Sequence, residues 1–575
     1  MRTAPTRLER RQRLKTRALP LVAIAFVSFV AGAINGCPGN PNRDAAERYL
    51  EAWQQKDYEA MHSELSTVSQ EAIPLDRFTE RYEEAEAVAT LQGIEPGEPG
   101  GDEDLAEIPV SASTLAFDTI QAPMKFTFGS DGIAWQSGLL FPGLEEGEQL
   151  DRKTRLPRRA SILANDGQVM VEGPSLARTY PLGDSMIDVT GTVGAGDEEP
   201  TLAQVAAGFS EGEPVGLSGI ELAYNSRLAG KPGGTLSAVP IEGGGQGRVL
   251  GEGDPEPAKP LKTTIDAELQ SVSVSALAGQ FGGVAVLDAR KGSIRALAGQ
   301  AFSVLQPPGS TMKIVTATAA LETGKATLDS EYEFSTSGIA DGREIDNAYG
   351  EVCGGSFVES FADSCNSVFA PLGMEIGEEQ LTETAEGFGF NRVPAIYNKE
   401  GTEAIDPPVP TIPQPGEYNN ELGVSAIGQG KVQATPLLMA SVSQAIARDG
   451  VTMPTPIATE PELQPDVEPM RVTDRKTANQ VTKGMIAVVT SGTGVAGAIP
   501  EAQVAGKTGT AEVGPRGGGA VDEEGNPDLV EDAWFSAFAP ADRPKLAIGV
   551  MIVDASAGGG TVAAPIASQI LSAGL

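Results

Sequence analysis

The sequence predicts a multidomain α+β protein whose largest domain is a central antiparallel sheet flanked by helices. With 575 residues the chain is too long for one hydrophobic core, since single cores stop growing at roughly 250–300 residues. Apolar strand patterns stand at both ends of the segment 263–575, with helical patterns between them, so both ends of this domain are expected to build one sheet. The segment 151–262 is rich in glycine and proline and has only short strand patterns, which indicates a β-rich spacer or pedestal.

The segment 1–37 has the pattern of an export signal. Its first 17 residues carry seven basic groups against one acid, and residues 18–34 are uncharged and mostly apolar. The apolar run ends in Ile34-Asn35-Gly36-Cys37, which resembles a bacterial lipobox, where Cys37 becomes the lipidated first residue. The run also lies at the lower limit for an uncleaved signal anchor, and a buried core helix is the third interpretation. The first two interpretations place residues 38–575 at the extracellular face of the cell membrane.

The segment 38–150 predicts a small α+β domain. Asp44 is expected to cap a first helix, a second short helix follows, and residues 106–136 alternate like strands. His62, the chain's single histidine, lies beside the apolar stripe of the second helix, so a structural role is expected for it. The apolar faces of the two helices hold Ala46, Tyr49, Leu50, Trp53, Tyr58, Met61 and Leu65.

The composition argues against several classes of function. The chain carries 42 basic against 78 acidic residues, a net charge of −36, so a nucleic-acid partner is not expected, because phosphate binding needs a basic surface. One histidine excludes most histidine-ligated metal sites, and three cysteines cannot form a four-cysteine zinc site. No metal and no cofactor are therefore expected, and an anionic ligand must be bound by a few local cations.

The elements of the segment 263–575 follow from its apolar patterns. A helix is expected from Thr264 to Leu277, and residues 251–257 before it are expected to form a linker. Buried strands are expected over 283–288, 294–298 and 545–554, and a closing helix over 563–571.

A candidate nucleophile lies at the start of another predicted helix. Pro307-Pro308-Gly309 ends the preceding segment, and the helix is expected to run to Leu321. Ser310 and Lys313, three residues apart, share one face of its first turn. A serine hydroxyl needs a base within hydrogen-bond reach, and a partly desolvated lysine is such a base. Alone, the pair has a plainer interpretation, a helix-capping serine and a solvated lysine.

Two further motifs change that interpretation. Ser364-Cys365-Asn366 follows a short helical stretch, and Lys507-Thr508-Gly509-Thr510 lies inside a strand-like run over 503–513. Each motif alone is compatible with a polar loop or an exposed edge strand. Together, the order Ser-x-x-Lys, Ser-x-Asn, Lys-Thr-Gly is the signature of penicillin-recognising serine acyltransferases.

The segment 263–575 resembles the transpeptidase domain of class B penicillin-binding proteins. Beyond the three motifs, the resemblance rests on Gly428-Gln429-Gly430 and on Ala533-Trp534-Phe535. Residues 215–221 resemble the family's pedestal, although residues 159–165 lack the Gly and the Asp-Arg pair that this pedestal usually carries. The N-terminal domain resembles that of the methicillin-resistance transpeptidases and of actinobacterial penicillin-binding lipoproteins.

The resemblance implies a peptidoglycan D,D-transpeptidase that cross-links stem peptides through a serine acyl-enzyme and binds penicillin covalently. It implies Ser310 as the nucleophile, Lys313 as its base and Ser364 as a proton relay. The further implied site residues are Asn366, Lys507, Thr508, Gly509 and Thr510. The backbone N–H groups of Ser310 and Thr510 are expected to form an oxyanion hole. The implied partners are peptidoglycan stem peptides, β-lactam antibiotics and a membrane glycosyltransferase.

Three other functions are alternatives to this one. A D,D-carboxypeptidase would use water as the acceptor, but the pedestal and the size favour the transpeptidase. A class D type β-lactamase shares the three motifs at about half this length. A non-enzymatic β-lactam sensor would normally have several membrane segments, whereas this sequence has one candidate segment.

The cysteines predict a disulfide beside the second motif. Lipidation accounts for Cys37, which leaves Cys353 and Cys365 as an even pair in an exported, oxidising compartment. Two buried free thiols are the alternative, because the short helix between the cysteines could hold their Cα atoms beyond the ~7 Å limit for a bridge. A bridge would fix the turn that presents Ser364 and Asn366.

Overall fold

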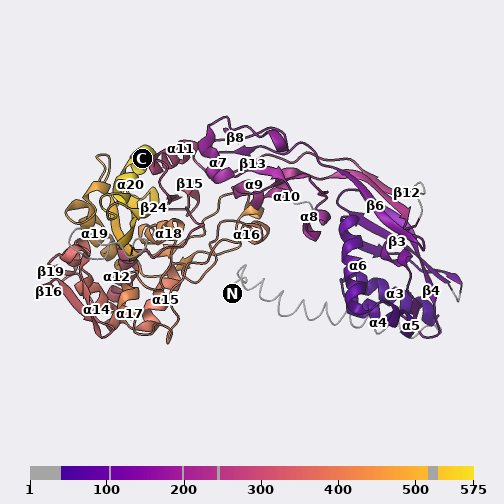
Figure 1. Cartoon of the computed structure of the whole chain (residues 1–575), viewed down its shortest axis with the longest axis horizontal. Coiled ribbons are helices and arrows are strands. Elements are labelled where there is room, and N and C mark those ends of the chain that lie inside the picture. Colours follow the sequence, from indigo (N-terminus) through magenta and orange to yellow (C-terminus); the bar gives the residue numbers. More distant parts are fainter. Residues whose placement is uncertain (1–39, 103–104, 197–199, 243–246, 516–528) are drawn as a thin grey trace, which may run out of the picture. The chain divides into compact units, whose positions relative to one another are not determined.

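Figure 1 shows the computed structural model of the chain, which describes residues 40–102, 105–196, 200–242, 247–515 and 529–575. The described chain divides into two compact units. The N-terminal unit holds the described residues up to Arg155 together with 201–208 and 233–254, and the C-terminal unit holds the others. The segment 151–262 therefore contributes to both units. The predicted export signal, including Cys37, lies outside the described residues.

The N-terminal unit combines helices with an antiparallel sheet. Its leading helices are α3 (Pro41–Gln54), α4 (Tyr58–Ser63), α5 (Thr67–Ala72) and α6 (Leu75–Val88). The sheet has the order β1 (Leu91–Pro96), β3 (Leu105–Thr114), β4 (Thr119–Phe128) and β5 (Ile133–Ala134), with β2 (Gly100–Asp102) paired to β3. Buried aromatic rings from helices α3 and α6 and strand β4, among them Tyr49, Tyr82 and Phe126, form the core between helices and sheet.

The start of the first helix differs from the expectation. Asn40, not Asp44, is the N-cap, and its side chain accepts a hydrogen bond from the N–H of Asn42 at 3.0 Å. Pro41 takes the first helical position, which proline favours because its fixed φ suits the helix and its missing N–H is not needed there. Asp44 lies in the first turn instead, where a carboxylate is favoured by the helix dipole.

The number of helices in this unit was also underestimated. Helices α5 and α6 follow the predicted pair, and α6 buries Phe78 and Tyr82. His62 lies half-buried at the end of α4, with its Nε2 2.8 Å from the carbonyl oxygen of Ile73. This contact within the N-terminal unit gives His62 a structural role, as its position beside the apolar stripe predicted.

A three-stranded sheet completes the N-terminal unit. It has the order β12 (Arg248–Gly253), β11 (Gly233–Pro240) and β6 (Glu148–Arg155). The prediction of a linker over 251–257 is therefore wrong at its start, because Gly251 pairs with Leu236 and Gly253 pairs with Gly234. A glycine-rich segment has the composition of a linker, and the sequence alone does not show that a strand elsewhere in the chain pairs with it.

The part of the C-terminal unit that precedes the large sheet is fixed by a buried ion triad. It contains a small sheet of β7 (Ile162–Leu163), β8 (Val169–Val171) and β13 (Leu261–Lys262). The carboxylate of Glu221 lies 2.6 Å from the guanidinium groups of both Arg159 and Arg178, and the three side chains are almost fully buried. A buried carboxylate is tolerated when it is paired in this way. Arg159 thus retains an ion pair although its surrounding motif departs from the family pattern.

The large sheet of the C-terminal unit is built from both ends of the segment 263–575, as predicted. Its order is β15 (Ile294–Gly299), β14 (Gly282–Asp288), β24 (Leu546–Ala555), β23 (Leu529–Ala539) and β22 (Ala505–Pro515). Every neighbouring pair is antiparallel. Strand β14 therefore lies beside β24, more than 250 residues later in the chain, and the predicted fold class is confirmed.

Helices cover both faces of this sheet (Figure 1). Val284 and Val286 of β14 join the core formed with α11 (Ala267–Leu277) and α20 (Ala563–Gly574). Ala285 and Leu287 point the other way and join the core that contains α18 (Pro436–Ala447). Because successive side chains of a strand point to opposite faces, a strand covered on both sides is apolar throughout.

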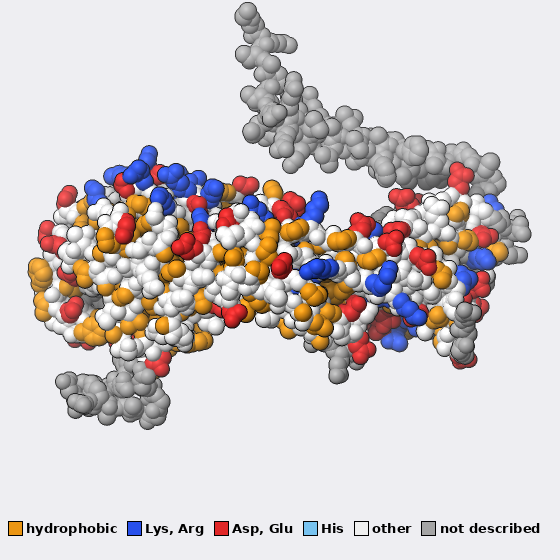
Figure 2. Space-filling model, turned by 90° about the horizontal axis from the view of Figure 1, so that it is seen from above, with side chains coloured by type: hydrophobic (Ala, Val, Ile, Leu, Met, Phe, Trp, Pro, Cys, Tyr) orange, Lys and Arg blue, Asp and Glu red, His pale blue; other side chains and the backbone are white. Residues whose placement is uncertain are grey.

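None of the helices in the described part of the chain has the length and apolar character that a membrane crossing requires. Figure 2 shows Asp and Glu side chains spread over the visible surface, whereas Lys and Arg side chains gather along one edge of the C-terminal unit. The two lysines of the sequence motifs, Lys313 and Lys507, are fully buried and do not belong to that surface.

Candidate active site

The predicted nucleophile lies on a tight turn before a helix. Ser310 belongs to a 3₁₀ turn, η6 (Gly309–Met312), and Lys313 opens helix α12 (Lys313–Glu322). Gly309 has a φ of +51°, and a Cβ at this position would lie 2.5 Å from the carbonyl oxygen of Thr510. The turn therefore needs a glycine for its backbone conformation and for the close approach of strand β22. This contact brings Ser310 next to the Lys-Thr-Gly strand.

The Ser-x-Asn motif lies between two helices, α13 (Phe357–Ala362) and α14 (Asn366–Ile376). Ser364 has a φ of +65°, in the left-handed region that residues other than glycine rarely adopt. This turn ends α13 and starts α14, so that Ser364 and Asn366 both reach Lys313. The capping box of Ser356 and Glu359 fixes the start of α13.

The Lys-Thr-Gly motif lies on β22, the edge strand of the large sheet. Lys507 pairs with Ser536 of β23, and Thr510 pairs with Ala533. The side chain of Lys507 is fully buried, and its Nζ lies 5.7 Å from the centre of the Phe361 ring. The predicted run 503–513 is thus a strand shifted by two residues, and it places the motif beside α13.

Lys313 is the centre of the hydrogen-bond network. Its Nζ lies 3.0 Å from Ser310 Oγ, 2.6 Å from the Ser364 carbonyl oxygen and 2.6 Å from Asn366 Oδ1. The amide of Asn366 donates to the carbonyl oxygen of Asp346, so its Oδ1 is the atom that faces Lys313. A neutral amine has two N–H groups and one lone pair. Since the two carbonyl oxygens can only accept, they can take both N–H groups, and the lone pair is left for a hydroxyl, with Ser310 Oγ at 3.0 Å and Ser364 Oγ at 3.2 Å in reach.

The surroundings of both lysines favour the neutral amine. Burial, and then the charge of Lys507, lower the pKa of Lys313 well below its usual 10.5. Burial lowers the pKa of Lys507 to about 7, against the opposing effect of the Asp363 carboxylate. Two buried lysines in one site are thus able to supply a proton acceptor and a positive charge without both being fully charged.

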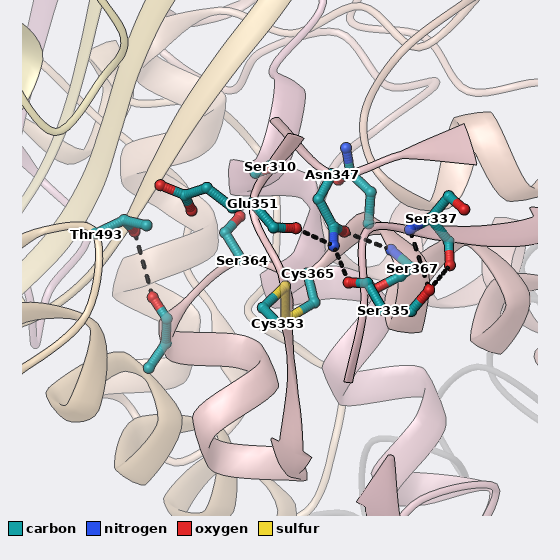
Figure 3. Close-up of a disulfide and its surroundings, with 12 residues drawn as sticks. Ser310, Ser335, Ser337, Asn347, Glu351, Cys353, Ser364, Cys365, Ser367 and Thr493 are labelled. Carbon is teal, nitrogen blue, oxygen red and sulfur yellow. Dashed lines mark hydrogen bonds between the residues drawn. A yellow bond between two sulfur atoms is a disulfide. The ribbon is translucent and has the colours of Figure 1, made fainter. Parts of the chain in front are cut away.

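The structure joins Cys353 and Cys365 in a disulfide with a Cα–Cα distance of 5.8 Å, and Figure 3 shows it beside Ser364. Cys353 opens strand β19 (Cys353–Ser356), and helix α13 brings the chain back to Cys365. The bridge therefore ties the middle residue of the Ser-x-Asn motif to the segment before α13.

A network of polar side chains holds the segment before this disulfide. Asn347 donates to the carbonyl oxygens of Ser335 and Glu351 and accepts from the N–H of Ser367, one residue after the Ser-x-Asn motif (Figure 3). Hydrogen bonds and the disulfide thus hold the same turn. The described residues contain no group of three or more His, Cys, Asp or Glu side chains that could hold a metal ion.

Two residues near the site were missed by the sequence. Thr493 lies 2.6 Å, oxygen to oxygen, from Thr508, and Tyr349 donates to Glu531 at 3.1 Å and shares a hydrogen bond with Thr510. Tyr349 lies on a short 3₁₀ turn, η7 (Ala348–Gly350), outside any chemical motif of the sequence. Thr493 lies in Ser491-Gly492-Thr493-Gly494, a run of small residues shortly before the Lys-Thr-Gly strand, which is the only signal that the sequence offers.

Two family descriptions match the chain. The penicillin-binding protein transpeptidase domain matches residues 282–572, just over half of the chain. The penicillin-binding protein dimerisation domain matches residues 168–263. The first match contains all three motifs, and the second covers the segment that the sequence indicated as a β-rich pedestal.

Relatives and solved structures agree with these matches. The chain is 33% identical over 296 residues to the peptidoglycan D,D-transpeptidase PbpA of Mycolicibacterium smegmatis, across 48% of this chain and 57% of PbpA. It is 28% identical over 473 residues to the stage V sporulation protein D of Bacillus subtilis, across 73% of this chain and 67% of that protein. The chain thus spans little more than half the length of PbpA.

Among solved structures, the D,D-transpeptidase domain of a peptidoglycan glycosyltransferase from Eggerthella lenta aligns with a TM-score of 0.56 at 26% identity, over 72% of this chain and 97% of that one. Penicillin binding protein 3 from Mycobacterium tuberculosis, complexed with aztreonam, aligns with a TM-score of 0.57 at 23% identity, over 73% and 96% of the two chains. At this identity the second likeness concerns the fold alone.

The fold and the three converging motifs define a penicillin-recognising enzyme domain. The chain belongs to the penicillin-binding protein transpeptidase family, and the dimerisation domain ahead of its transpeptidase domain makes it a class B penicillin-binding protein.

Proposed function

We propose that this protein is a peptidoglycan D,D-transpeptidase that works through an acyl-enzyme on Ser310. The observation that carries the proposal is the position of the Lys313 amine, 3.0 Å from the Ser310 hydroxyl, with both its N–H groups directed to carbonyl oxygens. A neutral, buried base within hydrogen-bond reach of the serine hydroxyl is what nucleophilic catalysis by serine requires.

In the first step, Ser310 Oγ attacks the carbonyl carbon of a terminal D-Ala-D-Ala bond, and the hydroxyl proton passes to Lys313. The negative charge on the carbonyl oxygen is stabilised by the backbone N–H groups of Ser310 and Thr510. The close contact between Gly309 and the backbone of Thr510 supports this placement of the two donors.

In the second half of the step, the leaving amine needs a proton. Ser364 Oγ lies 3.2 Å from Lys313 Nζ and 2.8 Å from Lys507 Nζ, so its hydroxyl connects the protonated base to the cleft. The amine takes a proton from Ser364, which is replenished from Lys313, and D-alanine departs. An amine of a second stem peptide then attacks the ester, loses a proton to the same network and restores the Ser310 hydroxyl.

The carboxylate of the substrate is held by Lys507, Thr508 and Thr510. Two of the three donors of the Lys507 ammonium have partners among the described residues, Ser364 Oγ and the Thr508 carbonyl oxygen at 3.1 Å. The third is left for an anion. A buried cation at the site lets a protein of net charge −36 bind an anionic substrate.

Mass spectrometry and product analysis test this function together. Treatment with penicillin should place one adduct on the peptide containing Ser310, absent in Ser310→Ala and retained in Ser303→Ala, an exposed serine nearby. A thioester donor with a D-amino acid acceptor should then yield the aminolysis product. Hydrolysis alone would favour a D,D-carboxypeptidase, and penicillin binding without turnover would favour a sensor. An adduct on another residue contradicts the assignment of Ser310.

We also propose that the protein acts at the extracellular face of the cell membrane, anchored through Cys37 or through an uncleaved signal helix, beside a glycosyltransferase that supplies the glycan strands. The support is the basic and apolar leader and its Ile34-Asn35-Gly36-Cys37 end. Metabolic labelling with an alkyne fatty acid tests the anchor. Label lost in Cys37→Ala indicates a lipid anchor, whereas membrane association without label indicates the helix.

A further inference from the structure

The loop before the Lys-Thr-Gly strand carries a threonine that joins two walls of the site. The loop follows helix α19 (Arg475–Thr490), and its Thr493 hydroxyl lies 2.6 Å from the Thr508 hydroxyl. The Thr493 backbone N–H donates to the carbonyl oxygen of Ala362 at 3.1 Å, and its hydroxyl lies 3.3 Å from the same oxygen. Figure 3 shows Thr493 at one side of the motif residues.

The hydrogens of this contact can be arranged in two ways. If Thr493 donates its hydroxyl proton to Ala362, Thr508 must donate to Thr493, and Thr508 then presents only lone pairs to the cleft. If Thr493 donates to Thr508, the proton of Thr508 is free to point at a ligand. A carboxylate only accepts hydrogen bonds, so only the second arrangement lets Thr508 bind it.

The second arrangement leaves only the Thr508 proton without a partner until a ligand binds. The Ala362 carbonyl oxygen keeps its bond from the Thr493 N–H, and the 2.6 Å contact to Thr508 is much shorter than the 3.3 Å contact to Ala362. The loop does not depend on the hydroxyl either. A Cβ at Gly492 would lie 2.3 Å from the Ala362 oxygen, and one at Gly560 would lie 2.2 Å from the Thr493 oxygen, so close backbone packing holds it.

We propose that Thr493 is a positioning residue that directs the Thr508 hydroxyl, so that the site selects acyl donors with a free terminal carboxylate. This inference rests on the proposed function. Lys507 attracts the carboxylate by charge, whereas Thr493 sets the hydrogen-bond direction of its neighbour. The consequence is a preference for a charged acceptor at the end of the ligand, and not for a particular ligand size.

The experiment compares penicillin with its methyl ester, and a thioester donor ending in a carboxylate with one ending in an amide. Thr493→Val keeps the shape and removes the hydroxyl, and Thr493→Ser restores it. We expect Thr493→Val to lower the second-order rate of Ser310 acylation by the acid about 3- to 10-fold, mainly through weaker binding, because the Thr508 hydroxyl loses the donor that turns its proton toward the carboxylate. The ester and the amide should change less than about twofold, and Thr493→Ser should recover the acid rate.

A double-mutant comparison covers the case in which Thr493→Val disturbs the fold. In a Thr508→Val background the Thr493→Val change should have no further effect on the acid rate, because the hydroxyl that it directs is already absent. An equal loss of rate with acid and ester, or a full further loss in the Thr508→Val background, overturns the inference. If the wild type still forms the Ser310 adduct, the proposed function stands. No Ser310 adduct in the wild type overturns both.

Discussion

Lys313 and Lys507 both contact one hydroxyl, Ser364 Oγ, at 3.2 Å and 2.8 Å. The three motifs of the site therefore meet at a single oxygen atom, held in a left-handed turn with a φ of +65°. Because both lysines are buried, water screens their charges little, and the two amines repel each other when both are protonated. The charge of Lys507 lowers the pKa of Lys313 at this short distance.

Removing the base should slow acylation. Lys313→Ala removes the group that accepts the Ser310 proton, and loss of a general base usually lowers rates about 10²–10⁴-fold. Stopped-flow measurement of penicillin acylation gives this rate. Lys325→Ala, an exposed lysine beyond the end of the same helix, should leave it unchanged. Wild-type rates in Lys313→Ala would show that another group takes the proton.

Removing the second cation should change the pH dependence. Acylation needs neutral Lys313, so the rate falls as the pH drops through the pKa of this amine. Burial and the charge of Lys507 both lower that pKa. In Lys507→Met the repulsion is gone, the pKa of Lys313 rises, and the half-maximal rate should move to higher pH.

The pH profile is best measured with a penicillin ester, since this substrate lacks the carboxylate that Lys507 is proposed to bind. The exposed Lys545→Met is the matched control and should keep the wild-type profile. A profile of Lys507→Met that stays in place or moves to lower pH contradicts the coupling between the two lysines.

The glycine before the nucleophile should be irreplaceable. Gly309→Ala adds a Cβ 2.5 Å from the Thr510 oxygen at a φ of +51°, so the turn and strand β22 must separate. We expect penicillin acylation to fall more than about tenfold, and the positive φ alone to cost about 1–3 kcal/mol of folding free energy.

Gly324→Ala is the control for this change. Gly324 also has a positive φ, +72°, but its Cβ would meet nothing within 4 Å. Denaturant unfolding should show a similar backbone cost in both variants, whereas acylation should be lost only in Gly309→Ala. Equal acylation rates in the two variants would show that the close contact of Gly309 with Thr510 is not needed for acylation.

The disulfide between Cys353 and Cys365 should support the Ser-x-Asn turn. Closing so short a loop stabilises a fold by roughly 2–3 kcal/mol. Reduction should lower the unfolding free energy by that amount and slow acylation, because Ser364 then loses one of its constraints. Thiol titration of the exported, denatured protein without reductant should detect no free thiol from this pair. Two reactive thiols would refute the bridge in the native protein.

Several features could be predicted from the sequence because they depend on residues close together in the chain. Ser310 and Lys313 are three residues apart at the start of one helix, and the Lys-Thr-Gly motif lies in a strand-like run, so each motif could be assigned to its element. The sheet built from both ends of the segment 263–575 was predictable for the same reason, since apolar runs such as 283–288 identify strands buried on both faces.

Predictions from local patterns were wrong where a distant strand or a neighbouring residue determined the secondary structure. Gly251 and Gly253 looked like a linker, but the pairing of β12 with β11 makes them part of a strand. Asp44 looked like a helix cap, but Asn40 followed by Pro41 starts the helix four residues earlier. Composition alone cannot decide between two local structures for the same segment, because the folding free energy depends on which backbone groups find hydrogen-bond partners.

The sequence by itself determined which side chains belong to the three motifs, their order, and the helix or strand that holds each motif. The reason is that the spacing along the chain fixes which side chains lie together on one helix turn or one strand. Only the tertiary structure decided how they meet. Ser364 is 51 residues from Lys313 and 143 from Lys507, and the hydroxyls of Thr493 and Thr508 touch across a loop. Hydrogen bonds between such distant groups form only when the packing of helices against the sheet brings their atoms within about 3 Å, and no spacing in the sequence encodes that distance.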